Sequence, residues 1–584
     1  MITPLDELKK RAWFSSYPQD IRDQMETYRL PQIPLHRFLE SSAKYFPDSV
    51  AIVHEPENFM VNYRDFYRLC ERFASGLQNK FGVKKGDRVA IYARNYPEFP
   101  IAHYGIVMIG GVYVACNPIL TGEEIAYQMK DSNTRIMITS EDMVPIVEKI
   151  LADKNTPLEK VIVFERDMEL RPSLFGSATR KWAPPFYKYA DVFSAEAFVK
   201  PEIDPLKDLA SVIYTSGTTG YPKGVMVSHY NATSSIIQYH STLTGKFPLL
   251  DGEGYVRCEN FPRDLTDKWE FPIRYGIDSV LAVTPFTHMM GYLVYMNCSV
   301  MAAMTIFPMP AFNTDLMIKM ITRWRIAFTG GAPPIMIMLL QRPDADQLDL
   351  SSIRAWSTGS APTPIAIGEK FEEKIGGVIT EGYAMTESAN SSTKNFCTRS
   401  EKRKFGSVGL PKPYTDIKVV DLVDGVTEMP IGKDGELVQC GPQVTLGYLN
   451  RPEDTQDVYR NGWLYTGDIG VMDEQGYFYI TGRKKELIIY KGYNIAPRTL
   501  EEILYEHPAV DQCAVVGKKD DMAGEIPVAF VALRAGAQAT PEELMSFVNG
   551  KVAAYKKVRE VRLVDRIPLN ANGKVMRKEL TAIL

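Results

Sequence analysis

The sequence predicts an α/β protein with a large N-terminal domain of doubly wound parallel sheets, an antiparallel β subdomain, and a small mobile α+β C-terminal domain. Its 584 residues exceed what one hydrophobic core usually supports. Strand and helix patterns alternate in the first half, and short strands with tight turns begin near residue 400. We therefore expect an N-terminal domain at 1–484, with the β subdomain at about 400–484, and a C-terminal domain at 485–584.

The alternating elements predict a parallel sheet that carries helices on its faces. The expected segments are strands at 88–92, 112–116, 135–139 and 161–164, with helices beginning near Pro97, Thr121 and Met143. Further strands are expected at 211–214, 279–283, 325–329 and 378–380. The apolar run 293–307 is shorter than the ~20 residues of a membrane-spanning helix. We interpret it as a buried helix and strand.

The C-terminal pattern predicts a separate small α+β domain. The expected segments are helices at 499–506 and 541–553 and strands at 510–517 and 528–533. About 100 residues suffice for such a domain. The polar, aromatic segment 244–274 fits none of these patterns, and a lid, a subunit contact and a surface excursion are all open for it.

Composition favours a soluble protein with small-molecule partners. Lys and Arg number 67 against 71 Asp and Glu, a formal net charge of -4, which offers no general attraction to nucleic acid or anionic lipid. Seven scattered cysteines without a C-x-x-C pair indicate neither disulfides nor zinc. A cytoplasmic location and no transmembrane segment are expected, and the oligomeric state is open, a homo-oligomer included.

The segment 214–224 has the composition of a phosphate-binding loop that follows an apolar strand. Its glycines allow the backbone to approach a polyphosphate, its hydroxyls can bind phosphate oxygens, and its lysine supplies charge. The candidate ligands are Thr215, Ser216, Gly217, Thr218, Thr219, Gly220 and Lys223. The spacing differs from that of a Walker P-loop, whose lysine and hydroxyl directly follow the second glycine. An ordinary surface loop is the alternative.

Four further segments, together with this loop, resemble the adenylate-forming superfamily of acyl-CoA synthetases, adenylation domains and beetle luciferases. They are 381–388 (EGYAMTES), 465–468 (YTGD), 482–486 (GRKKE) and 570–574 (NANGK), in the family's order. The resemblance covers nearly the whole chain. It implies ATP, Mg²⁺ and CoA as cofactors and an acyl-adenylate intermediate. A carboxylate attacks the α-phosphate of ATP, and a thiol then displaces AMP.

The resemblance also implies roles for individual residues in the adenylation step. Lys574, projected by the turn Asn572-Gly573, would be the main cation between carboxylate and α-phosphate, although a solvated basic tail is the alternative. Glu387 would bind Mg²⁺ and Thr386 the phosphate, whereas the same residues could simply cap a helix. The nucleotide would also contact Ser360, Ala361, Glu381, Gly382 and Tyr383. Ala384 stands where the family more often has glycine.

Asp468 and Arg483 are expected to face each other across a hairpin. The turn 473–476 lies almost midway between them, so an antiparallel hairpin places both near its open end. There the resemblance implies that they hold the ribose hydroxyls. A cross-strand salt bridge worth under ~1 kcal/mol is the alternative.

The thiol half-reaction requires the C-terminal domain to turn, and the resemblance implies a hinge at Lys485. Gly492 would then leave room for pantetheine, or it is a plain turn glycine. His288 belongs to a segment that resembles an acyl-site gate, although a lone histidine is usually structural. The residue six beyond Arg483 is Ile489, so the lysine that some relatives carry there is missing.

A methionine-rich stretch is a candidate acyl pocket, because flexible thioethers suit an adaptable apolar site. Its members are Met289, Met290, Met296, Met301 and Met304, around Gly291 and ahead of Gly330 and Gly331. Core packing is the more common use of methionines at such spacing.

These observations predict an AMP-forming acyl-CoA synthetase, an acid–thiol ligase whose leading candidate substrate is a medium-chain fatty acid. A freestanding adenylation enzyme that loads an amino or aryl acid onto a carrier protein is the nearest alternative. A luciferase-type oxygenase is a third, weaker alternative. A non-catalytic nucleotide-binding protein is the alternative from another class.

Overall fold

The computed structural model describes residues 2–55, 58–164, 182–215, 222–258, 271–359, 363–399, 403–520, 522–569 and 575–584. By its contacts the chain divides into two units. Unit 1 comprises 1–416, 439–464 and 475–477, and unit 2 comprises 417–438, 465–474 and 478–584. The expected domain boundary with a hinge at Lys485 stays a prediction. In the described residues no helix is both long and apolar enough to cross a membrane.

The first sheet of unit 1 is parallel except for one edge and has the order β7-β6-β5-β3-β4-β8-β9. Its strands are β3 (Arg88–Tyr92), β4 (Val112–Cys116), β5 (Ile136–Ser140), β6 (Lys160–Phe164), β7 (Phe186–Lys188), β8 (Leu209–Thr215) and β9 (Lys223–Ser228). Only β9 pairs antiparallel, with β8. The chain runs from β3 to β4 on one side of β3 and then returns to β5 on its other side, which is the doubly wound topology that the alternating pattern predicts.

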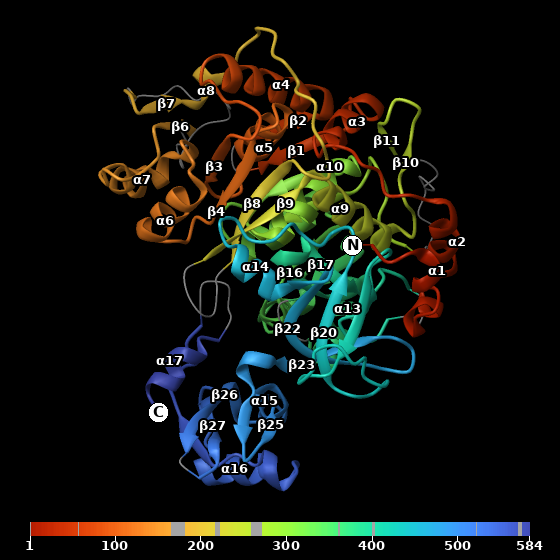
Figure 1. Cartoon of the computed structure of the whole chain (residues 1–584), viewed down its shortest axis with the longest axis vertical. Coiled ribbons are helices and arrows are strands. Elements are labelled where there is room, and N and C mark those ends of the chain that lie inside the picture. Colours follow the sequence, from red (N-terminus) through yellow and green to blue (C-terminus); the bar gives the residue numbers. More distant parts are fainter. Residues whose placement is uncertain are drawn as a thin grey trace. The chain divides into compact units, whose positions relative to one another are not determined.

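Helices cover both faces of this sheet because the crossovers run in opposite directions from β4. They are α4 (Tyr63–Asn79) and α5 (Glu98–Met108), which pack on each other, and α6 (Gly122–Ser132) and α7 (Val144–Leu151), which form a second pair (Figure 1). Helix α6 begins with a capping box in which Thr121 accepts from the N–H of Glu124. The sequence predicted this start.

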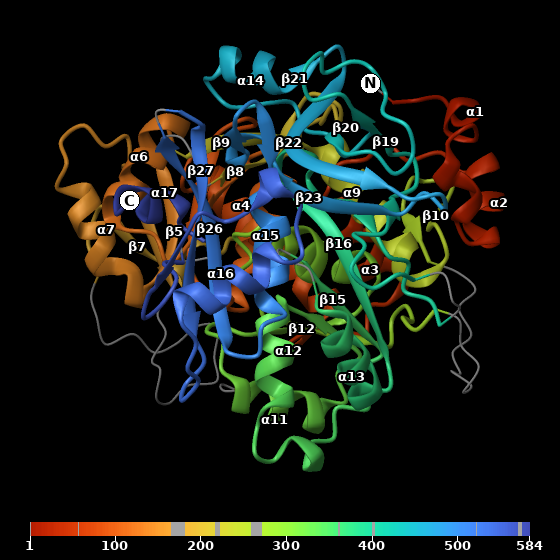
Figure 2. The same cartoon turned by 90° about the horizontal axis from the view of Figure 1, so that it is seen from below.

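The second sheet of unit 1 has nine strands in the order β18-β17-β16-β15-β14-β12-β13-β1-β2. They are β1 (Val50–His54), β2 (Phe59–Asn62), β12 (Ser279–Ala282), β13 (Thr305–Pro308), β14 (Phe328–Gly330), β15 (Ala355–Thr358), β16 (Val378–Met385), β17 (Asn390–Lys394) and β18 (Leu410–Pro411). The strands from β16 to β1 are parallel. Helices α11 (Thr314–Trp324), α12 (Pro333–Leu340) and α13 (Ile365–Ile375) lie together along it (Figure 2). They share a core with Leu281, Phe307 and Trp356.

The apolar run 293–307 is a buried helix and strand, as predicted. A π-helical segment (Met290–Cys298) and α10 (Ser299–Met301) lead into β13, and the long helix α9 (His229–Thr244) packs on the π-helical segment. The strand expected from Arg325 begins only at Phe328. Arg325 has φ of 50° and ends α11 in the left-handed conformation.

The described part of segment 244–274 is attached to α3 (Arg37–Tyr45). A short hairpin joins β10 (Leu249–Leu250) to β11 (Val256–Arg257). Asp251 in this hairpin accepts from Lys44 Nζ at 3.1 Å and from the Tyr45 hydroxyl. These contacts lie within unit 1, and the lid, the subunit contact and the surface excursion all stay open for this segment.

Unit 2 contains most of a five-stranded sheet, whose β21–β22 and β22–β23 pairs are antiparallel, and an α+β layer. The sheet has the order β19-β20-β22-β21, with β23 on β22, and comprises β19 (Asp416–Val420), β20 (Gly435–Cys440), β21 (Tyr459–Arg460), β22 (Trp463–Met472) and β23 (Phe478–Arg483). The α+β layer comprises β24 (Ile488–Tyr490), β25 (Tyr493–Ile495), β26 (Val510–Asp520), β27 (Gly524–Leu533) and β28 (Glu560–Leu563). Helices α15 (Pro497–Tyr505) and α16 (Pro541–Asn549) share one core with it, and α17 (Arg577–Ala582) shares another. The sequence did not predict β28 or α17.

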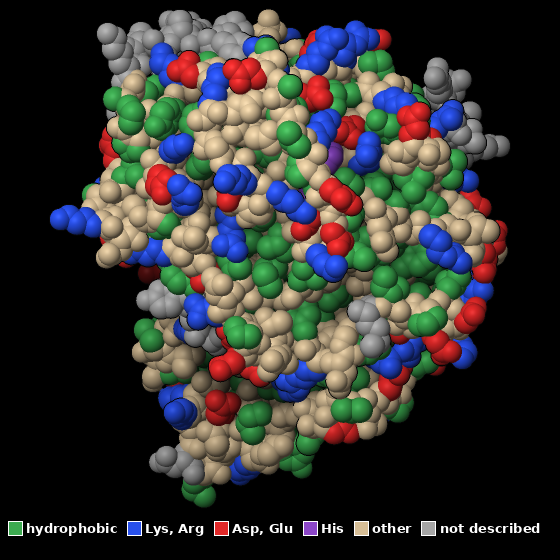
Figure 3. Space-filling view, turned by 45° about the horizontal axis from the view of Figure 1, so that its top comes forward, with side chains coloured by type: hydrophobic (Ala, Val, Ile, Leu, Met, Phe, Trp, Pro, Cys, Tyr) green, Lys and Arg blue, Asp and Glu red, His purple; other side chains and the backbone are tan. Residues whose placement is uncertain are grey.

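Surface charges of both signs are mixed on the face that Figure 3 shows, where Lys and Arg side chains alternate with Asp and Glu. This distribution agrees with the near balance of charges in the sequence.

Candidate functional site

The first nucleotide motif lies at the carboxyl end of β8, where parallel α/β sheets collect their ligands. Thr215 is the last residue of β8 and pairs with Lys223, the first residue of β9. The Thr215 hydroxyl donates to the carbonyl of Lys223 at 3.4 Å. Lys223 Nζ lies 2.5 Å from Asp454 Oδ1 and remains about a quarter exposed. Both ends of the loop are therefore fixed in the ladder, with a cation at one of them.

The second nucleotide motif comprises the last residues of β16 and the tight turn that follows it. Gly382 and Tyr383 lie on the strand, and the turn Thr386–Ser388 places Glu387 half-buried beyond it. The carbonyl of Glu387 accepts from the N–H and the hydroxyl of Thr445, at 3.0 and 2.9 Å. The backbone of the turn is thus held from outside its own strand.

One tyrosine joins the two motifs. The Tyr448 hydroxyl donates to Glu387 Oε1 at 2.7 Å, and Lys223 Nζ lies 5.1 Å from the centre of the Tyr448 ring. Burial, and then the charge of Glu387, raise the pKa of Tyr448, so the phenol keeps its proton and remains a donor. Residues 223 and 387, far apart in the chain, therefore meet at one side chain in unit 1.

Sequence reasoning missed Tyr448, Thr445 and Asp454. Residues 446–449 run beside β9, where Leu446 donates to the carbonyl of Met226 and Leu449 to that of Gly224. The alternation of Val444, Leu446 and Tyr448 is the only local signal of this strand-like segment, and it does not identify the partner.

Glu387 fits a magnesium ion by the chemistry of its donor oxygens. Within the described residues, Tyr448 is the one side chain that donates to the Glu387 carboxylate, which leaves Oε2 for a hard cation. Mg²⁺ is typically bound by one or two carboxylates together with substrate phosphates. Glu387 would hold the ion, and the ion would neutralise charge on the phosphates.

Glu381 connects its motif to neighbouring loops, and its role as a nucleotide ligand stays a prediction. It is buried, and its two oxygens accept from the N–H groups of Thr363 at 3.0 Å and Gly406 at 2.9 Å. Burial raises its pKa. Glu381 therefore joins the start of β16's motif to two neighbouring loops.

Asp468 and Arg483 face each other on β22 and β23, as the hairpin argument predicted. They are register partners, and Arg483 Nε donates to Asp468 Oδ1 at 2.6 Å. Asp468 is buried, whereas the Arg483 side chain is 43% exposed. The pair thus presents an exposed guanidinium beside a fixed carboxylate in unit 2.

Lys485 and Gly492 lie on either side of β24. Lys485 is exposed in the turn Lys484–Glu486. Gly492 follows Lys491 in a two-residue turn between β24 and β25, with φ of 82° and 49° respectively. Such turns need positive φ at both positions, so the turn alone explains this glycine. The expected roles in rotation and thiol access stay predictions.

His288 is exposed and its Nδ1 accepts from the N–H of Met290 at 3.3 Å. Phe286 beside it is fully buried against Phe99. Four of the methionines, Met289, Met296, Met301 and Met304, are at most 3% exposed. They belong to the core, and their part in an acyl pocket stays a prediction.

Several expected ligands lie outside the described residues. They are Ser216, Gly217, Thr218, Thr219, Gly220, Ser360, Ala361 and Lys574.

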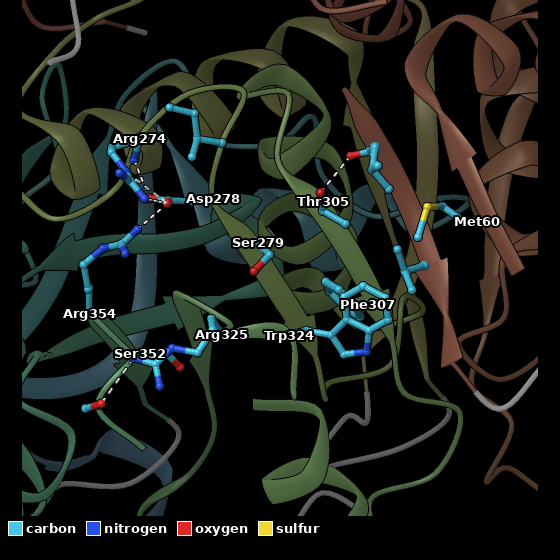
Figure 4. A pocket seen from close by; sticks show the side chains of 14 residues that line it. Met60, Arg274, Asp278, Ser279, Thr305, Phe307, Trp324, Arg325, Ser352 and Arg354 are labelled. Carbon is cyan, nitrogen blue, oxygen red and sulfur yellow. Dashed lines mark hydrogen bonds and ion pairs between the residues drawn. The ribbon is translucent and has the colours of Figure 1, made fainter. Parts of the chain in front are cut away.

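A cavity of about 450 Å³ lies at the amino ends of the parallel strands of the nine-stranded sheet, opposite to the ends that carry the second nucleotide motif (Figure 4). Ser279, Thr305 and Arg354 line it at or before the first residues of β12, β13 and β15. Arg274 and Arg354 both point toward Asp278 in Figure 4. Of the predicted nucleotide ligands that the structure describes, none lines this cavity.

Comparisons with known proteins agree with the motifs. The family model "AMP-binding enzyme" matches residues 39–449, and "AMP-binding enzyme C-terminal domain" matches 499–574. A long-chain-fatty-acid–CoA ligase of Bacillus subtilis is 34% identical over 98% of both chains. 4-Coumarate–CoA ligase 4 of Arabidopsis thaliana is 32% identical over 90% of this chain and 86% of its own. ATP-bound MatB from Rhodopseudomonas palustris superposes with a TM-score of 0.76 at 26% identity, over 94% of this chain and 99% of that one.

Parallel sheets with two nucleotide motifs at their carboxyl ends, followed by a C-terminal α+β layer, define an adenylate-forming enzyme. The chain belongs to the AMP-binding enzyme family, as an AMP-forming acid–thiol ligase of the acyl-CoA synthetase type.

Proposed function

We propose that this enzyme activates a carboxylic acid with ATP to an acyl-adenylate and then transfers the acyl group to CoA. The observation that carries the proposal is the meeting of Lys223 and Glu387 at Tyr448. A cation from one motif and a carboxylate from the other there share one side chain, an arrangement that suits a metal-bound triphosphate in contact with both.

The chemistry asks the protein for positioning and charge compensation, because two anions must approach each other. Lys223 would bind phosphate oxygens and Glu387 would hold Mg²⁺, with Thr386 on a phosphate. Asp468 and Arg483 would bind the ribose. Lys574 would stand between carboxylate and α-phosphate, and rotation at Lys485 would then bring Gly492 to the thiol path.

The acid is the open part of the proposal. A medium-chain fatty acid is the leading candidate. His288 would lie at the entrance of the site that binds the acyl chain. The proposed location of the enzyme is the cytoplasm. Relatives that match nearly the whole chain are named for long-chain fatty acids and for 4-coumarate, so both aliphatic and aryl acids belong in the test.

The test is exchange of labelled pyrophosphate into ATP with a panel of aliphatic, aryl and amino acids. We expect exchange that depends on the acid, and acyl-CoA formation without a carrier protein or O₂. Exchange without acyl-CoA, but with transfer to a carrier protein, would select the freestanding adenylation enzyme. Absence of exchange across the whole panel would refute the proposal and favour a binding protein.

A further inference from the structure

Two lysines lie in the core of unit 1 without an acidic partner. Lys394, the last residue of β17, is 1% exposed, and Lys412, just beyond β18, is fully buried. In the described part of the chain, neither amine forms an ion pair with a carboxylate within 4 Å. Lysine is almost never fully buried unless it is paired, so this arrangement needs an explanation.

The partners of both amines are uncharged. Lys394 Nζ donates to Ser357 Oγ at 2.9 Å and lies 4.7 Å from the centre of the Tyr239 ring. The Tyr239 hydroxyl donates to the same Ser357 Oγ, also at 2.9 Å. Lys412 Nζ lies 3.2 Å from Ser235 Oγ. Lys394 is therefore held in one place by two hydroxyl-bearing residues. The buried Glu381 carboxylate acts on its charge only from beyond ion-pair distance.

Lys394 lies directly behind the second nucleotide motif. It is the register partner of Gly382 across the β16–β17 ladder, and a Cβ on Gly382 would lie 3.7 Å from Lys394 Cγ. Ser357 is at the carboxyl end of β15, the edge at which parallel strands collect ligands. The amine thus lies in the core beside the second nucleotide motif.

The methionine-rich π-helical segment borders the same place. Its Tyr295 lies beside Gly330, where a Cβ would come within 2.9 Å of the Tyr295 hydroxyl and 2.0 Å of the Ser357 carbonyl. π-Helical turns are frequent at functional sites. Tyr295, Gly330 and Ser357 therefore lie together beside Lys394, on the core side of the second nucleotide motif.

Burial gives the Lys394 amine an unusual proton affinity. It lowers the pKa of Lys394 to about 7 and that of Lys412 well below its usual value. An amine of this kind can remain neutral when no ligand is present and become charged when an anionic group approaches.

We propose that Lys394, positioned by Ser357 and Tyr239, is a specificity-determining residue that binds a polar group at the far end of the acid. The preferred substrates then carry a second carboxylate or a hydroxyl there, instead of ending in a methyl group. This proposal rests on the proposed function and narrows its substrate class. A site built to hydrogen-bond a substrate group discriminates strongly against analogues that lack the group, because a buried polar atom is left unpaired.

The test compares octanoate with octanedioate and 8-hydroxyoctanoate in pyrophosphate exchange. We expect kcat/KM of the wild type to be at least about tenfold higher for one of the two polar-ended acids than for octanoate. Lys394→Met is expected to abolish this preference by lowering kcat/KM for the polar-ended acid at least tenfold while octanoate keeps or gains activity. Lys412→Met is the matched control, because the Lys412 amine is hydrogen-bonded to Ser235 and not to Ser357. In this variant the preference for the polar-ended acid over octanoate should survive.

The outcomes separate this proposal from the proposed function. A wild type that exchanges with octanoate as well as with both polar-ended acids overturns the specificity of Lys394 and leaves the ligase function intact. Equal loss for all three acids in a folded Lys394→Met variant also overturns it. If that variant does not fold, the proposal stands or falls with the preference of the wild type for a polar-ended acid over octanoate. No exchange with any acid overturns both.

Discussion

Removing the Tyr448 hydroxyl should weaken the magnesium dependence of the first half-reaction. Tyr448→Phe deletes one hydrogen bond of 2.7 Å to a carboxylate and leaves the ring in place against Lys223. A hydrogen bond to a charged group contributes about 1.5–3 kcal/mol. At 1.4 kcal/mol for each factor of ten, the apparent Mg²⁺ affinity should fall roughly 10- to 100-fold, as is usual when the partner of a metal-binding carboxylate is removed.

The assay is acid-dependent pyrophosphate exchange as a function of free Mg²⁺ at saturating ATP. Tyr459→Phe is the control, because the Tyr459 hydroxyl hydrogen-bonds Thr445 Oγ1 at 2.7 Å and the backbone carbonyl of Glu387 at 3.4 Å, but not the Glu387 carboxylate. Its Mg²⁺ curve should match the wild type. A Tyr448→Phe curve with an unchanged midpoint, at an unchanged melting temperature, would refute the role given to this hydroxyl and to Glu387.

Three further predictions concern other parts of the account. Asp468→Asn should raise KM for ATP roughly tenfold and change stability by under about 1 kcal/mol, because Arg483 is nearly half exposed; an unchanged KM with a lower melting temperature would make the pair purely structural. Lys574→Ala should cripple adenylate formation but spare thioester formation from supplied acyl-adenylate, and equal loss of both would contradict its role. Burial lowers the pKa of Lys394 from its usual 10.5 to about 7 in the folded protein, so the unfolded chain binds more protons between these values and the wild type becomes more stable as the pH rises through this range. Lys394→Met should therefore show its largest stability gain below pH 7 and lose it towards pH 10.5 in urea unfolding, whereas parallel pH profiles would place a normal amine there.

Local signals predicted much of the fold and part of the site. The register of Asp468 with Arg483 followed from counting residues on either side of a turn. The start of α6 followed from a capping box, and the parallel sheets followed from alternation. These features depend on neighbours in the sequence.

The missed features depend on contacts between distant segments. Tyr448 reaches Glu387 only because residues 446–449 align beside β9, and no spacing predicts that pairing. The run Asn390–Lys394 is polar in every position, yet it forms a buried central strand, β17. Its polarity would suggest an exposed strand, and only the fold reveals that Lys394 is in the core.

The most direct test of the central claim is the fate of oxygen in the first bond formed. The enzyme is given a carboxylic acid labelled with ¹⁸O in both carboxylate positions, together with ATP, Mg²⁺ and CoA, and the products are separated for mass spectrometry. Attack of the carboxylate on the α-phosphorus predicts one ¹⁸O in the AMP released and none in pyrophosphate. Label in inorganic phosphate or pyrophosphate, or unlabelled AMP beside acyl-CoA, would contradict it.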